Sequence, residues 1–203
     1  MKLANGGLRL ATLAFVAAAS VPSAYSVISF NLGAPINGSI PDGVAPYASA
    51  TLENNGANTV KVTLKNLAPT SNFIVRFNLN LTSNIDVSFA HLSGNVADST
   101  TDGPNHSDGH PSMMAGLFDI VFSYPTSNSD PNRFKGGEDS IYNLTGTGLD
   151  ETDFLAQSTG GYMAAARFQG ISNDGSGTVG LVPEPASLAA VAVGLAALRR
   201  RRK

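Results

Sequence analysis

The sequence predicts an all-β protein, an antiparallel β-sandwich of jelly-roll-like type, flanked by an N-terminal signal helix and a C-terminal transmembrane helix. Three observations support this prediction: period-two alternation of apolar and polar residues, turn-forming residues between the alternating segments, and an apolar run near each end of the chain. The region between the two ends is rich in Ser, Thr, Asn, Asp and Gly, which is typical of turn-rich β proteins.

The first element is a predicted secretory signal peptide over residues 1–26. Positively charged residues precede an apolar segment of about ten residues, Leu10–Ala19, which is too short to cross a bilayer. Ala24 and Ser26 are small residues at the −3 and −1 positions of a cleavage site, so the mature chain is expected to begin at Val27. The alternative, a buried N-terminal helix, does not account for the order of these three zones.

Three segments with strict alternation predict strands that bury one face, as in an antiparallel sheet. They are Thr59–Lys65, Phe73–Leu81 and Phe118–Tyr124. In the second segment, Arg76, Asn78 and Asn80 are expected on the solvent face. Weaker patterns predict five more strands: Val27–Leu32, Ala48–Glu53, Ile85–Leu92, Ser140–Leu144 and Tyr162–Gly170.

The end of the β-rich region contains one short helix and a predicted spacer. Asp150 is expected to be the N-cap of the helix, with Asp153 at its third position. We expect the β-sandwich ectodomain to cover residues 27–172. The Gly- and Ser-rich residues 173–181 that follow predict a flexible spacer between this domain and the membrane.

The last 22 residues, 182–203, have three parts. Pro183, Glu184 and Pro185 form a short motif, and the apolar residues 188–198 predict a helix of about 17 Å. A basic amphipathic helix is the alternative, but the apolar run has no polar face. The chain then closes with five basic residues that resist translocation across a membrane: Arg199, Arg200, Arg201, Arg202 and Lys203.

This arrangement of motif, helix and basic cluster resembles the PEP-CTERM sorting signal of exported bacterial proteins. The resemblance implies that an exosortase-type membrane processing enzyme recognises Pro183, Glu184 and Pro185 and removes the tail. It further implies an exported protein that is anchored transiently in the inner membrane and then reaches the cell surface or extracellular matrix, in the context of extracellular polysaccharide.

A second resemblance covers part of the ectodomain. Gly116–Ile120 and Met163–Ile171 are similar, in order and composition, to segments of small ectodomains that often precede this sorting signal. Related chains have a His where this sequence has Arg167. Because that ectodomain family has no established activity, the resemblance bears on the fold and not on the function.

Composition excludes several classes of function. The chain has no Cys, which excludes disulfides, thiolate nucleophiles and Cys-ligated zinc. Six basic and fourteen acidic residues lie within residues 27–181, so the ectodomain has a formal charge of −8. This charge argues against nucleic acid as a partner. We also expect no cofactor, because Gly-rich phosphate-binding loops are absent from the sequence.

Catalytic and metal-binding patterns are weak. His106 and His110, together with Asp108, are candidate metal ligands, but the Gly and Pro residues around them prevent the helix on which this spacing would bring both imidazoles to one face. We therefore predict that residues 98–111 form an irregular loop without a metal centre. The Gly-x-Ser-x-Gly nucleophile motif is absent from the sequence, and neighbouring acids are explained by capping and solvation.

The sequence thus favours a non-enzymatic, exported cell-envelope or extracellular-matrix protein that is sorted by its tail. One alternative is a carbohydrate-binding β-sandwich module, for which Tyr47, Tyr142 and Tyr162 would have to cluster on one exposed face. The other is a hydrolase, which would need a cleft with convergent carboxylates or histidines.

Overall fold

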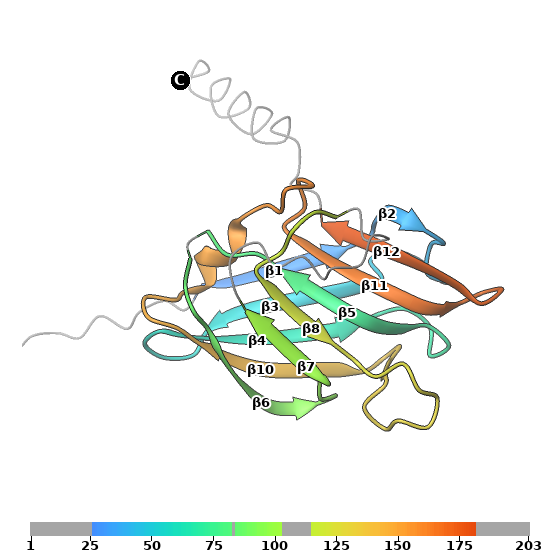
Figure 1. The fold of residues 1–203 in the computed structure, drawn as a ribbon, viewed down its shortest axis with the longest axis horizontal. Helices are drawn as coiled ribbons and strands as arrows, with labels where there is room; N and C mark the ends of the chain where they lie inside the picture. Colours follow the sequence, from blue (N-terminus) through green and yellow to red (C-terminus); the bar gives the residue numbers. More distant parts are fainter. Residues whose placement is uncertain (1–25, 83, 103–114, 182–203) are drawn as a thin grey trace, which may run out of the picture.

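The computed structural model describes residues 26–82, 84–102 and 115–181, which form twelve strands and one short helix. The strands make two antiparallel sheets that pack face to face (Figure 1). The predicted all-β antiparallel sandwich is therefore confirmed, whereas its jelly-roll character stays a prediction. The predicted signal and transmembrane helices lie outside the described residues.

Within those ranges, no helix combines the length and the apolar character needed to cross a membrane.

The first sheet has five strands in the order β1-β3-β4-β10-β6. All of its pairs are antiparallel, and β3 and β4 are joined through a turn that contains Asn55 and Gly56. Its strands are β1 (Val27–Leu32), β3 (Ala48–Asn54), β4 (Thr59–Asn66), β10 (Asp139–Thr145) and β6 (Ser88–Gly94).

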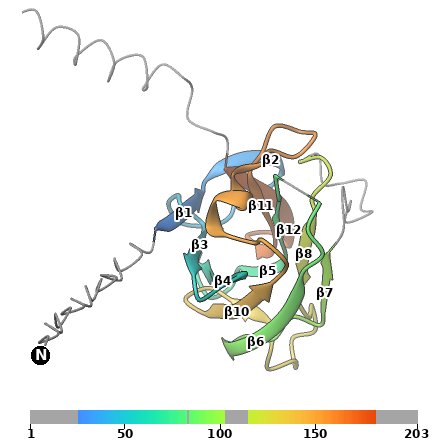
Figure 2. The ribbon, with the colours of Figure 1, turned by 90° about the vertical axis from the view of Figure 1, so that its left-hand side faces the viewer.

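The second sheet follows the order β2-β12-β11-β5-β8-β7, with the short β9 paired to β5. Figure 2 shows the strands of the two sheets enclosing a common interior. The strands of this sheet are β2 (Ala34–Gly38), β12 (Gly175–Leu181), β11 (Ala164–Ile171), β5 (Phe73–Leu79), β8 (Ile120–Ser123), β7 (Ser99–Asp102) and β9 (Phe134–Lys135).

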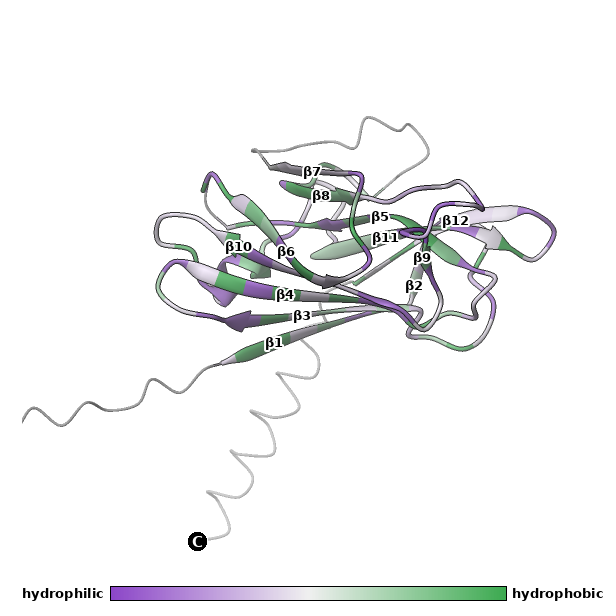
Figure 3. Cartoon of the chain, turned by 90° about the horizontal axis from the view of Figure 1, so that it is seen from below, coloured by the Kyte–Doolittle hydropathy of each residue, from purple (hydrophilic) through white to green (hydrophobic). Residues whose placement is uncertain are grey.

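The core lies between the sheets and is built as the alternation predicts. Figure 3, which views the sheets from the side, shows β1, β3 and β4 in one layer and β5, β8 and β7 in the other. On β4 the alternate residues Val60, Val62 and Leu64 are fully buried. Five phenylalanines are also fully buried, and each contributes about 2–3 kcal/mol of apolar transfer free energy. They are Phe77, Phe122, Phe134, Phe154 and Phe168.

All eight predicted strands are present, with ends shifted by up to three residues. The additional strands β2, β7, β9 and β12 were not predicted. They are short or rich in Gly and Pro, so they lack the alternating apolar residues by which a strand is recognised in sequence.

The solvent face predicted for β5 is wrong. Asn78 and Asn80 are 0% and 3% exposed, so this strand is buried on both sides. The outer side is covered because Ala115 and Phe118 pack with Ala165 of β11 in a second, smaller apolar cluster. Alternation in sequence identifies the face that joins the main core, but it does not show that another segment covers the opposite face.

The register of β5 also contains an irregularity that alternation does not reveal. Arg167 of β11 lies opposite Arg76, yet the next residue, Phe168, lies opposite Ile74. Val75 is therefore the extra residue of a β-bulge. As a result Ile74 joins the main core on the same side as Phe77, whereas the alternation predicted Val75 there.

The flexible spacer predicted for residues 173–181 is wrong over 175–181, and the sandwich extends past residue 172. These residues form β12, an inner strand hydrogen-bonded to both β11 and β2. Its glycines allow the backbone after β2 to approach closely. A Cβ on Gly177 would lie 1.8 Å from the backbone oxygen of Ser39. Asn173 and Asp174 have φ of 64° and 55°, as in the tight turns that join hairpin strands.

The predicted short helix is confirmed as a 3-10 helix, η1 (Glu151–Leu155). Its N-cap is Asp150, whose carboxylate accepts a hydrogen bond of 2.8 Å from the backbone N–H of Thr152. The carboxylate of Asp153 in turn accepts from the N–H of Asp150 at 3.0 Å, which completes a capping box. These acids thus have a structural role in capping.

Asn66, at the end of β4, ties the two sheets together. Its side-chain amide is fully buried and donates to the carbonyl oxygens of Asn72 and Phe134 at 3.2 and 3.0 Å. Its side-chain oxygen accepts from the N–H of Ala68 at 3.1 Å. One side chain therefore satisfies three backbone groups where the chain passes from one sheet to the other.

Candidate functional site

The sandwich ends directly before the Pro-Glu-Pro segment. Leu181, the last residue of β12, lies opposite Ala164 of β11, and its carbonyl oxygen accepts from the N–H of Met163 at 3.1 Å. Pro183 follows two residues later, which places it within about 7 Å of the end of the sheet even if the chain is fully extended. Any enzyme that acted on this segment would have to approach it close to the folded domain.

At the other end of the chain, the predicted leader cleavage point adjoins the edge strand β1. Of the two small residues proposed for this point, Ser26 is described and Ala24 lies outside the described residues. The Ser26 hydroxyl donates a hydrogen bond to the carboxylate of Glu151, which is only 5% exposed. This contact connects the start of β1 to the first turn of η1.

A row of polar residues crosses the outer face of the seven-stranded sheet, and the sequence analysis did not identify it. Arg76 on β5 and Arg167 on β11 lie directly opposite each other. On the strands to either side of β5 and β11, the residues paired in line with these arginines carry hydroxyl or amide side chains. The arginine row consists of Ser99, Ser123, Arg76, Arg167, Thr178 and Asn37.

Two buried polar side chains, one beside the arginine row and one within it, have no hydrogen-bond partner among the described residues. Asn78 lies two residues from Arg76 on the same face of β5, and its side-chain nitrogen and oxygen are both unpaired. Thr178 lies opposite Arg167, is 1% exposed, and has an unpaired hydroxyl. Buried polar groups are rarely left unpaired in proteins, so these two side chains are an unusual feature of the sheet.

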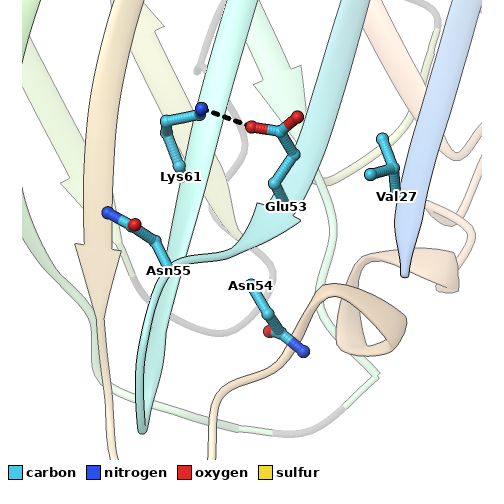
Figure 4. Close-up of a pocket in the computed structure, with 5 residues that line it drawn as sticks. All are labelled: Val27, Glu53, Asn54, Asn55 and Lys61. Carbon is cyan, nitrogen blue, oxygen red and sulfur yellow. Dashed lines mark ion pairs between the residues drawn. The ribbon is translucent and has the colours of Figure 1, made fainter. Parts of the chain in front are cut away.

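A depression of about 300 Å³ lies on the outer face of the other sheet, beside the edge strand β1. Figure 4 shows Lys61 and Glu53 pointing toward one another across it, where they form an ion pair. Both side chains are about one-third exposed. A cross-strand ion pair that is this exposed contributes little to the free energy of unfolding.

Comparison with known proteins identifies the tail. The family model for the PEP-CTERM protein-sorting motif matches residues 181–203. This chain carries a PEP-CTERM sorting motif. No curated protein and no solved structure matches the chain.

The PEP-CTERM motif marks exported proteins that an exosortase-type enzyme processes, and the match begins at Leu181, where β12 ends. The predicted recognition residues Pro183, Glu184 and Pro185 lie within the match but outside the described residues, as do the five basic residues Arg199–Lys203. Their roles stay predictions. The motif and the fold therefore meet without an intervening spacer.

The predicted metal candidates His106, His110 and Asp108 also lie outside the described residues. Among the residues that are described, no group of three or more His, Cys, Asp or Glu side chains is arranged to hold a metal ion. The remaining histidine, His91, is exposed, and its ring packs edge-on against Tyr142 with centroids 5.1 Å apart.

The three tyrosines proposed for carbohydrate binding do not form an exposed platform. Tyr47 and Tyr142 are 8% and 3% exposed, and Tyr162 packs against the smaller apolar cluster. The hydroxyl of Tyr142 accepts a hydrogen bond of 2.7 Å from the backbone N–H of Ala97. These residues thus have structural contacts, and the carbohydrate-binding alternative stays an untested prediction.

Asp42 holds together three segments near one end of the seven-stranded sheet. Its carboxylate accepts from the side-chain amide of Asn72 at 2.8 Å and from the hydroxyl of Ser172 at 2.7 Å. The hydrogen bonds from Asn72 and Ser172 lower the pKa of Asp42 below its ordinary value, because they stabilise the charged form. The arrangement is that of a structural carboxylate.

Proposed function

We propose that this chain is a non-enzymatic cell-envelope or extracellular-matrix protein, exported by its leader and delivered by its PEP-CTERM tail. The observation that carries the proposal is the family match over residues 181–203. The sequence also supports it, since the chain lacks Cys and the nucleophile motif of serine hydrolases. In this proposal the β-sandwich is the domain that is exported, and the tail is the sorting signal that directs it.

The tail has the physical features of a substrate for an exosortase-type enzyme. Proline fixes φ and disfavours helix at the preceding residue, so the sequence of Pro183 and Pro185 favours the extended backbone that a protease cleft binds. Glu184 provides a single carboxylate for recognition. The basic residues 199–203 resist translocation and keep the tail in the inner membrane until processing.

The test is Glu184→Ala in the native host, with the C-terminus of the exported protein determined by mass spectrometry. We expect the tail to be retained while export and folding remain intact. Glu53→Ala is the matched control, because it removes the same side chain from the surface of the sandwich and should be processed as wild type. If Glu184→Ala matures at the wild-type rate to the wild-type C-terminus, Glu184 is not a recognition residue and the sorting proposal is wrong.

A further inference from the structure

Glu151 is a buried carboxylate whose hydrogen-bonding capacity is only partly used. It is the first residue of η1 and is 5% exposed. Its Oε1 accepts a hydrogen bond from the Ser26 hydroxyl. Among the residues that the structure describes, the other oxygen, Oε2, has no hydrogen-bond partner, although it is shielded from solvent. A carboxylate in this setting is costly to bury unless a cation or further donors are placed beside it.

The described partner of Glu151 lies on the leader side of the predicted cleavage point. Ser26 is the last residue of the predicted signal peptide, so its hydroxyl leaves the protein with the leader. Hydrolysis of the amide between Ser26 and Val27 adds water across the bond, leaving a carboxylate on the leader and an ammonium on Val27. Standard bond lengths place the Val27 nitrogen within about 5 Å of the Ser26 hydroxyl oxygen. The new positive charge therefore appears beside the Glu151 carboxylate.

We propose that Glu151 is the binding site for the mature N-terminus, and that the α-ammonium of Val27 replaces the Ser26 hydroxyl there once the leader is removed. The ammonium has three N–H donors, so it can serve both carboxylate oxygens. Hydrogen bonds between two charged groups are about twice as strong as neutral ones. The start of β1 is thus held more firmly against η1 in the mature protein than in the precursor. This inference rests on the leader of the proposed function, but no residue of the tail takes part.

A second carboxylate lies near the new N-terminus. Glu53 of β3 is directly opposite Val27, and its carboxylate forms an ion pair with Lys61. Both side chains of this pair are about one-third exposed, so solvent can reach Glu53 and Lys61 already offsets its charge. Glu151 is buried and has an unpaired oxygen, and it therefore gains more from the ammonium than Glu53 does.

The test compares the leader-free chain, residues 27–203 in detergent, with and without its N-terminal charge. Cyanate carbamoylates an α-amino group in preference to lysine, because the α-amino group has the lower pKa. Mass spectrometry establishes that Val27 alone is modified. Carbamoylation should lower the thermal midpoint of wild type by about 3 °C or more. In Glu151→Gln it should lower the midpoint by less than about 1 °C, because both changes remove the same interaction.

Glu53→Gln is the matched control, and carbamoylation should lower its midpoint as much as that of wild type. An unchanged midpoint after carbamoylation of wild type would overturn the proposal, even if Glu151→Gln does not fold. An effect that is lost in Glu53→Gln and kept in Glu151→Gln would assign the ammonium to Glu53, which also overturns it.

Mass spectrometry of the N-terminus in the native host separates this inference from the sorting proposal. We expect the exported protein to begin at Val27. A start at another residue would overturn the inference, whereas the sorting proposal depends on how the Glu184→Ala variant is processed.

Discussion

Substituting Val179 by Ala tests whether β12 belongs to the folded domain. If residues 173–181 were a flexible spacer, the side chain of Val179 would be exposed to solvent. In the structure Val179 is 0% exposed and belongs to the main core. The substitution removes two methyl groups, which amount to roughly 1.6 kcal/mol of transfer free energy at about 0.8 kcal/mol each. Incomplete collapse around the cavity raises the expected loss of unfolding free energy to about 2–3 kcal/mol.

Val44→Ala is the matched control, because it makes the same chemical change at a side chain that is 88% exposed. Both variants are compared by chemical denaturation in one background, residues 27–181, so that neither terminal segment contributes. We expect the unfolding free energy to fall by that amount for Val179→Ala and to change by less than about 0.5 kcal/mol for Val44→Ala. Equal stability of the two variants would show that Val179 is not part of the core, and would support a flexible spacer at residues 175–181.

Three further substitutions test contacts that the structure assigns. Asn66→Ala should lower the unfolding free energy by about 2–4 kcal/mol, because it leaves three buried backbone groups unpaired. In the same denaturation assay, Asn55→Ala at an exposed asparagine should be nearly neutral. Tyr142→Phe should cost about 0.5–1.5 kcal/mol because the partly buried N–H of Ala97 loses its acceptor; an unchanged thermal midpoint would contradict this. Asp42→Asn should be less stable than wild type at neutral pH. This difference in stability should vanish as the pH falls from above 3.8 through the lowered pKa of Asp42. Thermal unfolding of both proteins at several pH values measures it.

The parts of the fold that follow from local pattern were predictable from the sequence. The strand at Val27–Leu32 has the predicted bounds, and the capping box at Asp150 forms where the spacing of acids indicates. In both cases the determining interactions lie within a few residues or follow the period of the strand. The same reasoning identified the sorting motif, because its three parts are contiguous in the chain.

The β12 strand was missed for a physical reason that the sequence shows only indirectly. Its glycines at 175, 177 and 180 are typical of flexible linkers, but here they are needed because β2 and its neighbours approach too closely for side chains. The signal that was available is the pair Asn173–Asp174, since both residues tolerate positive φ and thereby favour a hairpin turn.

The arginine row could not be predicted because it depends on register between strands distant in sequence. Arg76 and Arg167 are 91 positions apart, and the register of β5 against β11 shifts directly beside this pair, at the β-bulge of Val75. A shift by one residue would place one arginine toward the core. Alternation within a single strand carries no information about such a partner.

The position of β12 has a mechanical consequence. While the tail is held in a membrane, any force on the exported domain enters the fold through Leu181. Gly180, the residue before it, is paired on one side with Ala165 of β11 and on the other with Ala34 of β2. A load directed along β12 must therefore shear two ladders of backbone hydrogen bonds at once, whereas an edge strand would resist with only one. A pull on the tail is thus borne by a strand paired on both sides, and the domain would keep its fold under a load that could remove an edge strand.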